Sequence, residues 1–142
     1  MIVLAILEDD LPRRDAMRAL LPADVDVAWF DRAPPMIEWL RERLQSCVLV
    51  SLDHDLVALS GEDPGSGMDV AEFLATQWPC ATVLVHTSNP LAAPGMMWLL
   101  EHAGWSVERI VPFSDLEWVE RAWAPAVHRA VEQGRTPPGS GR

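Results

Sequence analysis

The 142-residue chain contains no lysine and no tyrosine, and all eleven of its basic side chains are arginine. Because the acidic residues number 21, the formal net charge is −10 at pH 7. General binding to nucleic acid or to an anionic membrane relies on a surface rich in Lys and Arg, so this charge argues against both functions. It does not exclude recognition of one terminal nucleotide in a pocket.

Cysteines and long apolar runs are also scarce. The N-terminal apolar run, residues 1–7, is too short to span a membrane. It has neither the basic start nor the small-residue cleavage site of a signal peptide, so we expect a cytoplasmic protein. Cys47 and Cys80 lack the spacing of a metal site, which predicts two small, buried hydrophobic side chains near strand starts.

Apolar runs alternate along the chain with amphipathic segments, and the length fits one domain. The apolar runs predict strands over 2–7, 25–30, 47–52, 81–85 and 107–111. Helical spacing predicts helices over 12–21, 34–44, 68–78, 93–103 and 115–133, the last with a kink at Pro125. We therefore expect one domain over residues 1–133 and a disordered Gly/Pro/Ser-rich tail over 134–142.

Five strands that alternate with five helices predict an α/β fold, in which helices cover both faces of a parallel sheet. The strand order 2-1-3-4-5 is common for five such units and gives a flavodoxin-like three-layer sandwich. Its topological switch point lies between the first and third strands. Open α/β sheets bind their ligands at such a point, outside the carboxyl ends of the strands.

Acidic residues directly follow the first and third predicted strands, at this switch point. Like charges that lie close together need compensation, and Mg²⁺ suits a few carboxylates together with water and phosphate oxygens. The sequence therefore predicts a divalent metal site, with Mg²⁺ as the expected ion. The alternatives are a solvated pair of acidic loops, or a helix N-cap formed by Asp10. The five candidate metal ligands are Glu8, Asp9, Asp10, Asp53 and Asp55.

The fourth predicted strand also ends in polar residues, beginning with His86. The hydroxyl groups of Thr87 and Ser88 and the amide of Asn89 can form hydrogen bonds with phosphate oxygens, so they are candidate phosphate-binding residues. The alternative is that Ser88 or Asn89 caps the following helix.

Two histidines, His54 and His86, lie at the ends of adjacent predicted strands. Opening a cyclic phosphodiester needs a base to activate water and an acid to protonate the leaving oxygen. Two imidazoles with an ordinary pKa of about 6.5 can fill both roles near neutral pH. The predicted catalytic residues are therefore these two histidines and Asp53. The alternative is a structural histidine at each strand end; His102 and His128 lie within helices, and we expect them at the surface.

Residues 8–10, Asp53 and Thr87 each follow a strand and resemble the phosphoryl-acceptor receiver domains of response regulators. The segment 67–69, Gly-Met-Asp, resembles the start of the receiver's third helix. This resemblance covers about residues 1–133. It implies that the acidic pair binds Mg²⁺, that Asp53 accepts a phosphoryl group and that Thr87 contacts that group.

The chain departs from the receiver pattern after the fifth strand. Receivers carry a lysine there, whereas residues 110–113 are Ile-Val-Pro-Phe; Arg109 could replace it, but its strand position is expected to point it away. The motifs at 52–56 and 86–89 are more similar to those of cyclic-phosphate-processing receiver domains. That resemblance implies action on cyclic phosphate ends, with residues 8–10 and Asp53 binding the metal or phosphate and His54 and His86 as the acid/base pair.

Three functions are compatible with this sequence. The first is a metal-assisted phosphoesterase that acts on a phosphate-containing small molecule or on a 2′,3′-cyclic nucleotide or RNA end. The second is an atypical receiver phosphorylated on Asp53, against which the missing lysine counts. The third is a non-catalytic interaction module. Here the Trp- and Met-rich last third of the chain predicts either core packing or a face for a partner or homodimer, formed by Met96, Met97, Trp98, Trp105, Trp118 and Trp123.

Overall fold

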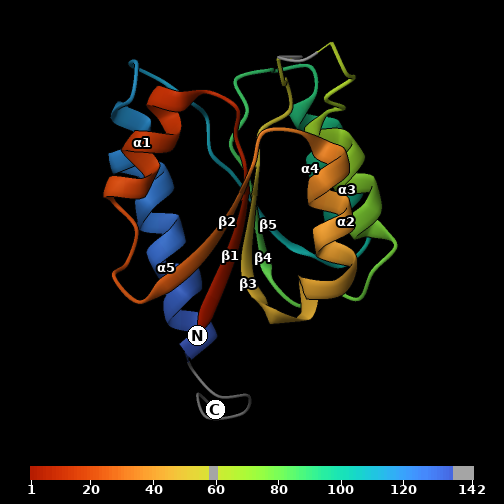
Figure 1. The fold of residues 1–142 in the computed structure, drawn as a ribbon, viewed down its shortest axis with the longest axis horizontal. Coiled ribbons are helices and arrows are strands. Elements are labelled where there is room, and N and C mark those ends of the chain that lie inside the picture. The colour runs from red at the N-terminus through yellow and green to blue at the C-terminus, as the bar shows by residue number, and fades with distance from the viewer. Residues whose placement is uncertain (58–60, 136–142) are drawn as a thin grey trace.

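The computed structural model describes residues 1–57 and 61–135, in which strands and helices alternate (Figure 1). The strands are β1 (Ile2–Leu7), β2 (Val25–Phe30), β3 (Cys47–Leu52), β4 (Thr82–Val85) and β5 (Ser106–Arg109). The α-helices are α1 (Leu11–Ala19), α2 (Ala33–Arg43), α3 (Gly67–Ala75), α4 (Ala93–His102) and α5 (Ala124–Arg135). A 3₁₀ turn, η1 (Leu44–Ser46), precedes β3, and a π-helical turn, η2 (Val119–Trp123), leads into α5.

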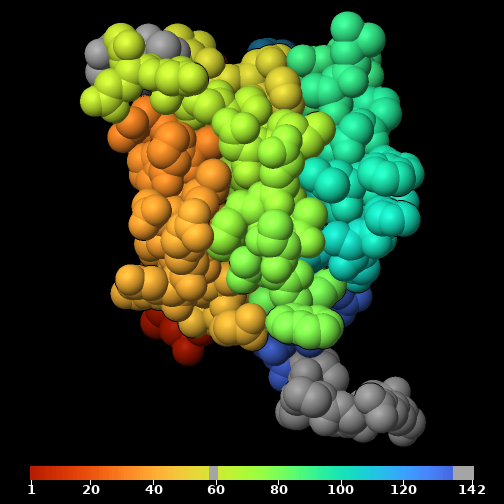
Figure 2. Space-filling model, turned by 90° about the vertical axis from the view of Figure 1, so that its right-hand side faces the viewer, coloured from red at the N-terminus to blue at the C-terminus, as the bar shows by residue number. Residues whose placement is uncertain are grey.

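The strands form a parallel sheet in the order β2-β1-β3-β4-β5, which confirms the predicted fold class. Figure 1 shows the sheet edge-on, with α1 and α5 on one face and α2, α3 and α4 on the other. The second of these faces is seen in Figure 2, where the three helices lie side by side. Near-continuous apolar strands fit this arrangement, because both faces of the sheet are covered.

Strand register places the polar residues that follow β1, β3 and β4 at one level. Leu7 pairs with Leu52, and Leu52 pairs with Val85. The ladder continues one step further, since the Asp53 amide donates to the Leu7 carbonyl and the His86 amide to the Leu52 carbonyl. The three strand ends therefore meet at the carboxyl edge of the sheet, as the switch-point argument predicts.

Side chains alternate between the two sheet faces and divide the core into two clusters. Leu52 and Val85 pack with the cluster beneath α2, α3 and α4, while Leu84 packs with that beneath α1 and α5. Of the tryptophans in the last third, Trp105, Trp118 and Trp123 are buried. Trp98 is 64% exposed, and Met97 is partly buried beside it in the chain. Met96 is also buried, and the four buried residues divide between the two core clusters, as the core-packing alternative predicts. The partner or homodimer face stays a prediction that only Met97 and Trp98 could serve.

Three sequence-based expectations need correction. Cys80 is exposed and only Cys47 is buried, because Cys80 precedes the start of β4 instead of lying within the strand. The single helix predicted over 115–133 is instead a π-helical turn followed by α5, which begins at Ala124; the kink at Pro125 stays a prediction. Helix α5 also continues to Arg135, so residues 134 and 135 are helical and not part of a tail; the rest of the predicted tail, 136–142, lies outside the described residues.

None of the helices among the described residues is both long enough and apolar enough to cross a membrane.

Candidate functional site

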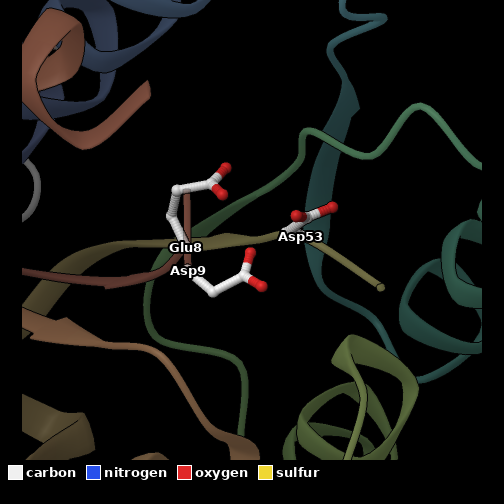
Figure 3. Close-up of side chains that lie close together, drawn as sticks. All are labelled: Glu8, Asp9 and Asp53. Carbon is white, nitrogen blue, oxygen red and sulfur yellow. The ribbon is translucent and has the colours of Figure 1, made fainter. Parts of the chain in front are cut away.

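Three carboxylates meet at the ends of β1 and β3 (Figure 3). One oxygen from each of Glu8, Asp9 and Asp53 lies within 4.8 Å of the others, a spacing that could hold a metal ion. Glu8 is fully buried, Asp53 is 5% exposed and Asp9 is half-buried. We call these three residues the acidic cluster.

The other two candidate metal ligands are engaged beside this cluster. Asp10 caps α1 by accepting a hydrogen bond from the Arg13 amide at 3.0 Å, as the N-cap alternative predicts. Asp55 lies 2.8 Å from Nδ1 of His54 and accepts from the Asn89 side chain at 3.3 Å. The five predicted ligands are therefore divided: three form the cluster, and Asp10 and Asp55 lie at its edge.

Burial and mutual repulsion shape the charges of the acidic cluster. Burial, strengthened by the charge of Glu8, raises the pKa of Asp53 to about 6, although His86, the His54 amide and Arg13 oppose this shift. The pKa of Asp9 is also raised, mainly by burial. Burial would raise the pKa of Glu8 too, but the hydrogen bond with His86 and further contacts hold it below its ordinary value. The cluster thus has excess negative charge that a bound cation would offset.

Arg13 is a site residue that the sequence reasoning missed. Its Nη1 lies 3.6 Å from Glu8 Oε1 and 3.7 Å from Asp53 Oδ2, and its guanidinium lies 5.4 Å from the centre of the Trp118 ring. The sequence signal that could have identified Arg13 as a site residue was its position in the first turn of a helix capped by Asp10. By contrast, Arg109 donates to the carbonyls of Val85 and Ile110, so it points away from the cluster as expected.

A cleft of about 490 Å³ opens beside the acidic cluster. A volume of this size can accept a small phosphate-bearing ligand. The cleft combines carboxylates, one guanidinium and one hydroxyl group with a few apolar side chains. Its lining residues are Asp9, Asp10, Leu11, Pro12, Arg13, Asp53, Asp55, Val57 and Ser88.

The two candidate catalytic histidines have different environments. His86 is fully buried, with Nδ1 2.7 Å from Ser51 Oγ and Nε2 3.2 Å from Glu8 Oε1. His54 is partly exposed at 22% of its side chain, and its Nδ1 faces Asp55. Neither histidine is among the described residues that line the cleft. Their assignment as an acid/base pair therefore stays a prediction. The buried His86 contacts Glu8, which is also not among the described residues that line the cleft.

Of the three candidate phosphate-binding residues, Ser88 alone lines the cleft among the described residues. Thr87 is fully buried, and its hydroxyl accepts a hydrogen bond from the Asn89 amide at 3.1 Å. Asn89 Oδ1 accepts from the amides of Leu91 and Ala92, which caps the turn before α4. Helix α4 has Ala92 at its N-cap and no side-chain cap, so Asn89 closes the preceding turn and does not cap the helix; its amide also links this turn to Asp55.

A parallel sheet in this order, with an acidic cluster at its switch point, defines a receiver-like domain. Solved receiver structures agree. The receiver domain of a response regulator from Rhodospirillum rubrum has a TM-score of 0.67 at 15% identity, over 91% of this chain and 94% of that one. The phosphorylated cyanobacterial phytochrome response regulator RcpA has a TM-score of 0.70 at 11% identity, over 92% and 94% of the two chains. Likeness at such low identity establishes the fold.

The family follows from a more specific match. The family model described as "Cyclic-phosphate processing Receiver domain" matches residues 4–102. The chain belongs to this family, and the resemblance drawn from the motifs at 52–56 and 86–89 is confirmed. A comparison with curated proteins found no match.

Proposed function

We propose that this domain binds a cyclic phosphate and opens it as a metal-assisted phosphoesterase, with a 2′,3′-cyclic nucleotide or RNA end as the substrate class. The observation that carries the proposal is the acidic cluster beside Arg13 in a cleft of about 490 Å³. The carboxylates would bind the metal ion, and Arg13 would bind the phosphate. Both are needed because a phosphodiester is an anion, and three carboxylates alone would repel it.

The donor set of the acidic cluster fits Mg²⁺. This ion takes one or two protein carboxylates and completes its shell with water and phosphate oxygens. Glu8 already contacts His86, the Asp10 amide and Arg13, so Asp9 and Asp53 are the carboxylates best placed to bind it directly. When bound, Mg²⁺ would polarise a phosphoryl oxygen and neutralise part of the charge that develops during attack.

Arg13 and Ser88 are suited to hold the phosphate. A guanidinium offers several N–H donors in a planar fork that matches phosphate oxygens. Trp118 supports this guanidinium from below, which limits the entropy lost when a ligand binds. The exposed hydroxyl of Ser88 supplies a further donor from the end of β4.

His54 is the histidine best placed for proton transfer. An ionised Asp55 only accepts hydrogen bonds, so the short contact places the His54 proton on Nδ1. The neutral ring then has its lone pair on Nε2, which can take a proton from an attacking water. His86 is the proposed second member of the pair and contacts Glu8 of the acidic cluster, and a variant of each histidine separates their contributions.

The test is hydrolysis of a 2′,3′-cyclic nucleotide in Mg²⁺, followed by ³¹P NMR. We expect the wild type to form a phosphomonoester, and His54→Gln to lose activity by roughly 10²–10⁴-fold, the range for a general acid or base. The matched control is His102→Gln, because His102 is exposed and stacks on Trp98 in α4, away from the cleft. Undiminished activity in both His54→Gln and His86→Gln would contradict the acid/base assignment.

Phosphorylation of Asp53 is a second candidate function, favoured by one observation. Arg13 lies 3.7 Å from Asp53 and could balance an acyl phosphate in place of the missing lysine. Incubation with acetyl phosphate and Mg²⁺ would then label the protein, and Asp53→Asn would abolish the label. Labelling without hydrolysis would replace the phosphoesterase by a signalling receiver. If both assays were negative, the non-catalytic interaction module would be favoured.

A further inference from the structure

A continuous line of hydrogen bonds runs from η2 into the acidic cluster. Trp123 Nε1 donates to Ser51 Oγ at 3.0 Å, Ser51 Oγ lies 2.7 Å from His86 Nδ1, and His86 Nε2 lies 3.2 Å from Glu8 Oε1. All four side chains are fully buried. They come from η2, β3 and the ends of β4 and β1, so the line joins segments that are far apart in the sequence.

The chemistry of the donors fixes the direction of this line. An indole N–H can only donate, so Trp123 occupies a lone pair of the Ser51 hydroxyl. The hydroxyl has one proton of its own, and His86 Nδ1 lies at hydrogen-bond distance to accept it. The ring proton is then on Nε2, which donates to the carboxylate of Glu8. Every group in the line is satisfied in this assignment.

The opposite assignment leaves buried groups without partners. If Nδ1 of His86 carried the proton, Ser51 Oγ would receive two donors, and its own proton would have no acceptor among the described residues. In the neutral ring, a bare Nε2 would also face the Glu8 carboxylate, so that two acceptors would oppose each other. A buried polar network is stable only when all of its members are paired.

The π-helical turn places two tryptophans of one segment against His86 and its partner Ser51. The Ala124 amide bonds to the Val119 carbonyl, the i→i+5 pattern of a π-helix. Trp118 and Trp123 are five residues apart on either side of this wider turn, so that Trp118 lies against His86 and Trp123 against Ser51. Trp118 stacks on the imidazole at 6.1 Å between ring centres, while Trp123 holds Ser51. Such turns are frequent at functional sites.

We propose that Trp123 and Ser51 are positioning residues of the acidic cluster, which hold His86 in its Nε2–H tautomer so that it orients Glu8. The consequence for metal binding rests on the proposed function, because it requires the acidic cluster to be the metal site. Hydrogen-bond partners behind metal ligands typically change metal affinity by roughly 10–100-fold when removed. The tautomer itself does not depend on any ligand.

The first test is ¹⁵N NMR of histidine-labelled protein without metal, with the His86 signals assigned by their loss in His86→Gln. We expect the wild type to show a protonated Nε2 and a bare Nδ1. Ser51→Ala removes the donor to Nδ1 and should shift the Nδ1 signal, whereas Ser51→Thr keeps the hydroxyl and should preserve it. If Ser51→Ala does not fold, Trp123→Phe removes the first donor of the line and keeps an aromatic ring in the core.

The matched control for Trp123→Phe is Trp105→Phe. Trp105 is also buried and donates its indole N–H to a carbonyl, that of Leu74, but it packs in the cluster on the other face of the sheet. Calorimetric titration with Mg²⁺ is the second test. Because Glu8 lies behind the proposed ligands Asp9 and Asp53, we expect Ser51→Ala and Trp123→Phe to bind Mg²⁺ more weakly than the wild type, by up to roughly tenfold, and Trp105→Phe to bind it unchanged.

Two results would overturn the proposal: a protonated Nδ1 in the wild type, or a Ser51→Ala variant that keeps both the wild-type His86 signals and the wild-type Mg²⁺ affinity. A wild type that binds no Mg²⁺ would instead refute the metal site and the effect on it. The ¹⁵N signals would still decide whether Ser51 and Trp123 set the tautomer.

Discussion

Asp53 carries the largest electrostatic strain of the site. Only 5% of the residue is exposed, and its carboxylate lies near Glu8 with only partial compensation from His86 and Arg13. A buried carboxylate of this kind stores unfavourable energy in the ligand-free protein. A cation that binds at the acidic cluster would remove this unfavourable energy. The protonation state of Asp53 therefore affects both the stability of the fold and its affinity for a metal ion.

The raised pKa of Asp53, about 6 against an ordinary value of 3.8, predicts how stability changes with pH. The folded state binds the proton more tightly than the unfolded state, so this contribution is complete below pH 4 and is lost as the pH rises to 6. In a chelator, we expect the free energy of unfolding to fall by up to about 3 kcal/mol across this window because of Asp53. Urea denaturation of the wild type and Asp53→Asn checks this, since the variant should lack the fall; parallel pH profiles would contradict it.

The substitution Arg13→Gln tests whether Arg13 binds the phosphate of the ligand. A charged hydrogen bond contributes roughly 1.5–3 kcal/mol, so we expect a cyclic nucleotide to bind about 10- to 100-fold more weakly in the presence of Mg²⁺. Arg14→Gln is the matched control, because Arg14 lies on the same helix but over the ring of Trp29. Equal affinities of the two variants, measured by calorimetry, would remove Arg13 from the site.

At the scale of elements, the loop from β3 to α3 depends on a close backbone approach at Gly67. The Gly67 amide donates to the His54 carbonyl at 3.0 Å, and a Cβ at this position would lie 1.8 Å from the Asp53 carbonyl oxygen. No L side chain fits there without moving the backbone that presents Asp53 and His54. The contact at Gly67 therefore fixes the backbone directly after β3, where Asp53 and His54 lie in the site.

We expect Gly67→Ala to lower the free energy of unfolding by more than about 2 kcal/mol, the scale of overpacking in a rigid environment. Gly95→Ala is the control, because Gly95 lies inside α4 and its new Cβ would meet only the flexible end of Met68 at 3.3 Å. Its stability should stay within about 1 kcal/mol of the wild type, since alanine favours the helix. Chemical denaturation of both variants decides; equal stability would show that the Gly67 backbone can move.

Some elements of the fold and of the site could be predicted from the sequence, and others could not. The strands were predictable because buried parallel strands are continuous apolar runs, and the strand ends followed from the switch-point rule. The π-helical turn was not predictable, because residues 119–123 have ordinary helical composition and the contacts of Trp118 with His86 and of Trp123 with Ser51 join segments far apart in the sequence. Arg13 was missed for a similar reason: its contacts depend on the position of α1 over the sheet.

The whole molecule carries a formal charge of −10, which limits how it can meet an anionic substrate. A long nucleic acid would be repelled by most of this surface, whereas a terminal cyclic phosphate has only to reach one cleft. We expect an oligonucleotide with a 2′,3′-cyclic end to bind no more tightly than a cyclic mononucleotide. Its affinity should also lack the steep fall with salt that phosphate-backbone contacts produce. Fluorescence titrations across salt concentrations test this, and affinity that grows with oligonucleotide length would contradict it.

We propose that the acidic cluster and Arg13 form one site, in which a metal ion and a phosphate bind together. The most direct test of this proposal is calorimetric titration of Mg²⁺ at pH 7.5, with and without a 2′,3′-cyclic nucleotide, in the wild type and Asp53→Asn. We predict that each ligand strengthens binding of the other by the same factor, roughly 5–150-fold, and that Asp53→Asn removes this coupling. Independent binding of the two ligands, or coupling that survives in Asp53→Asn, would contradict the account.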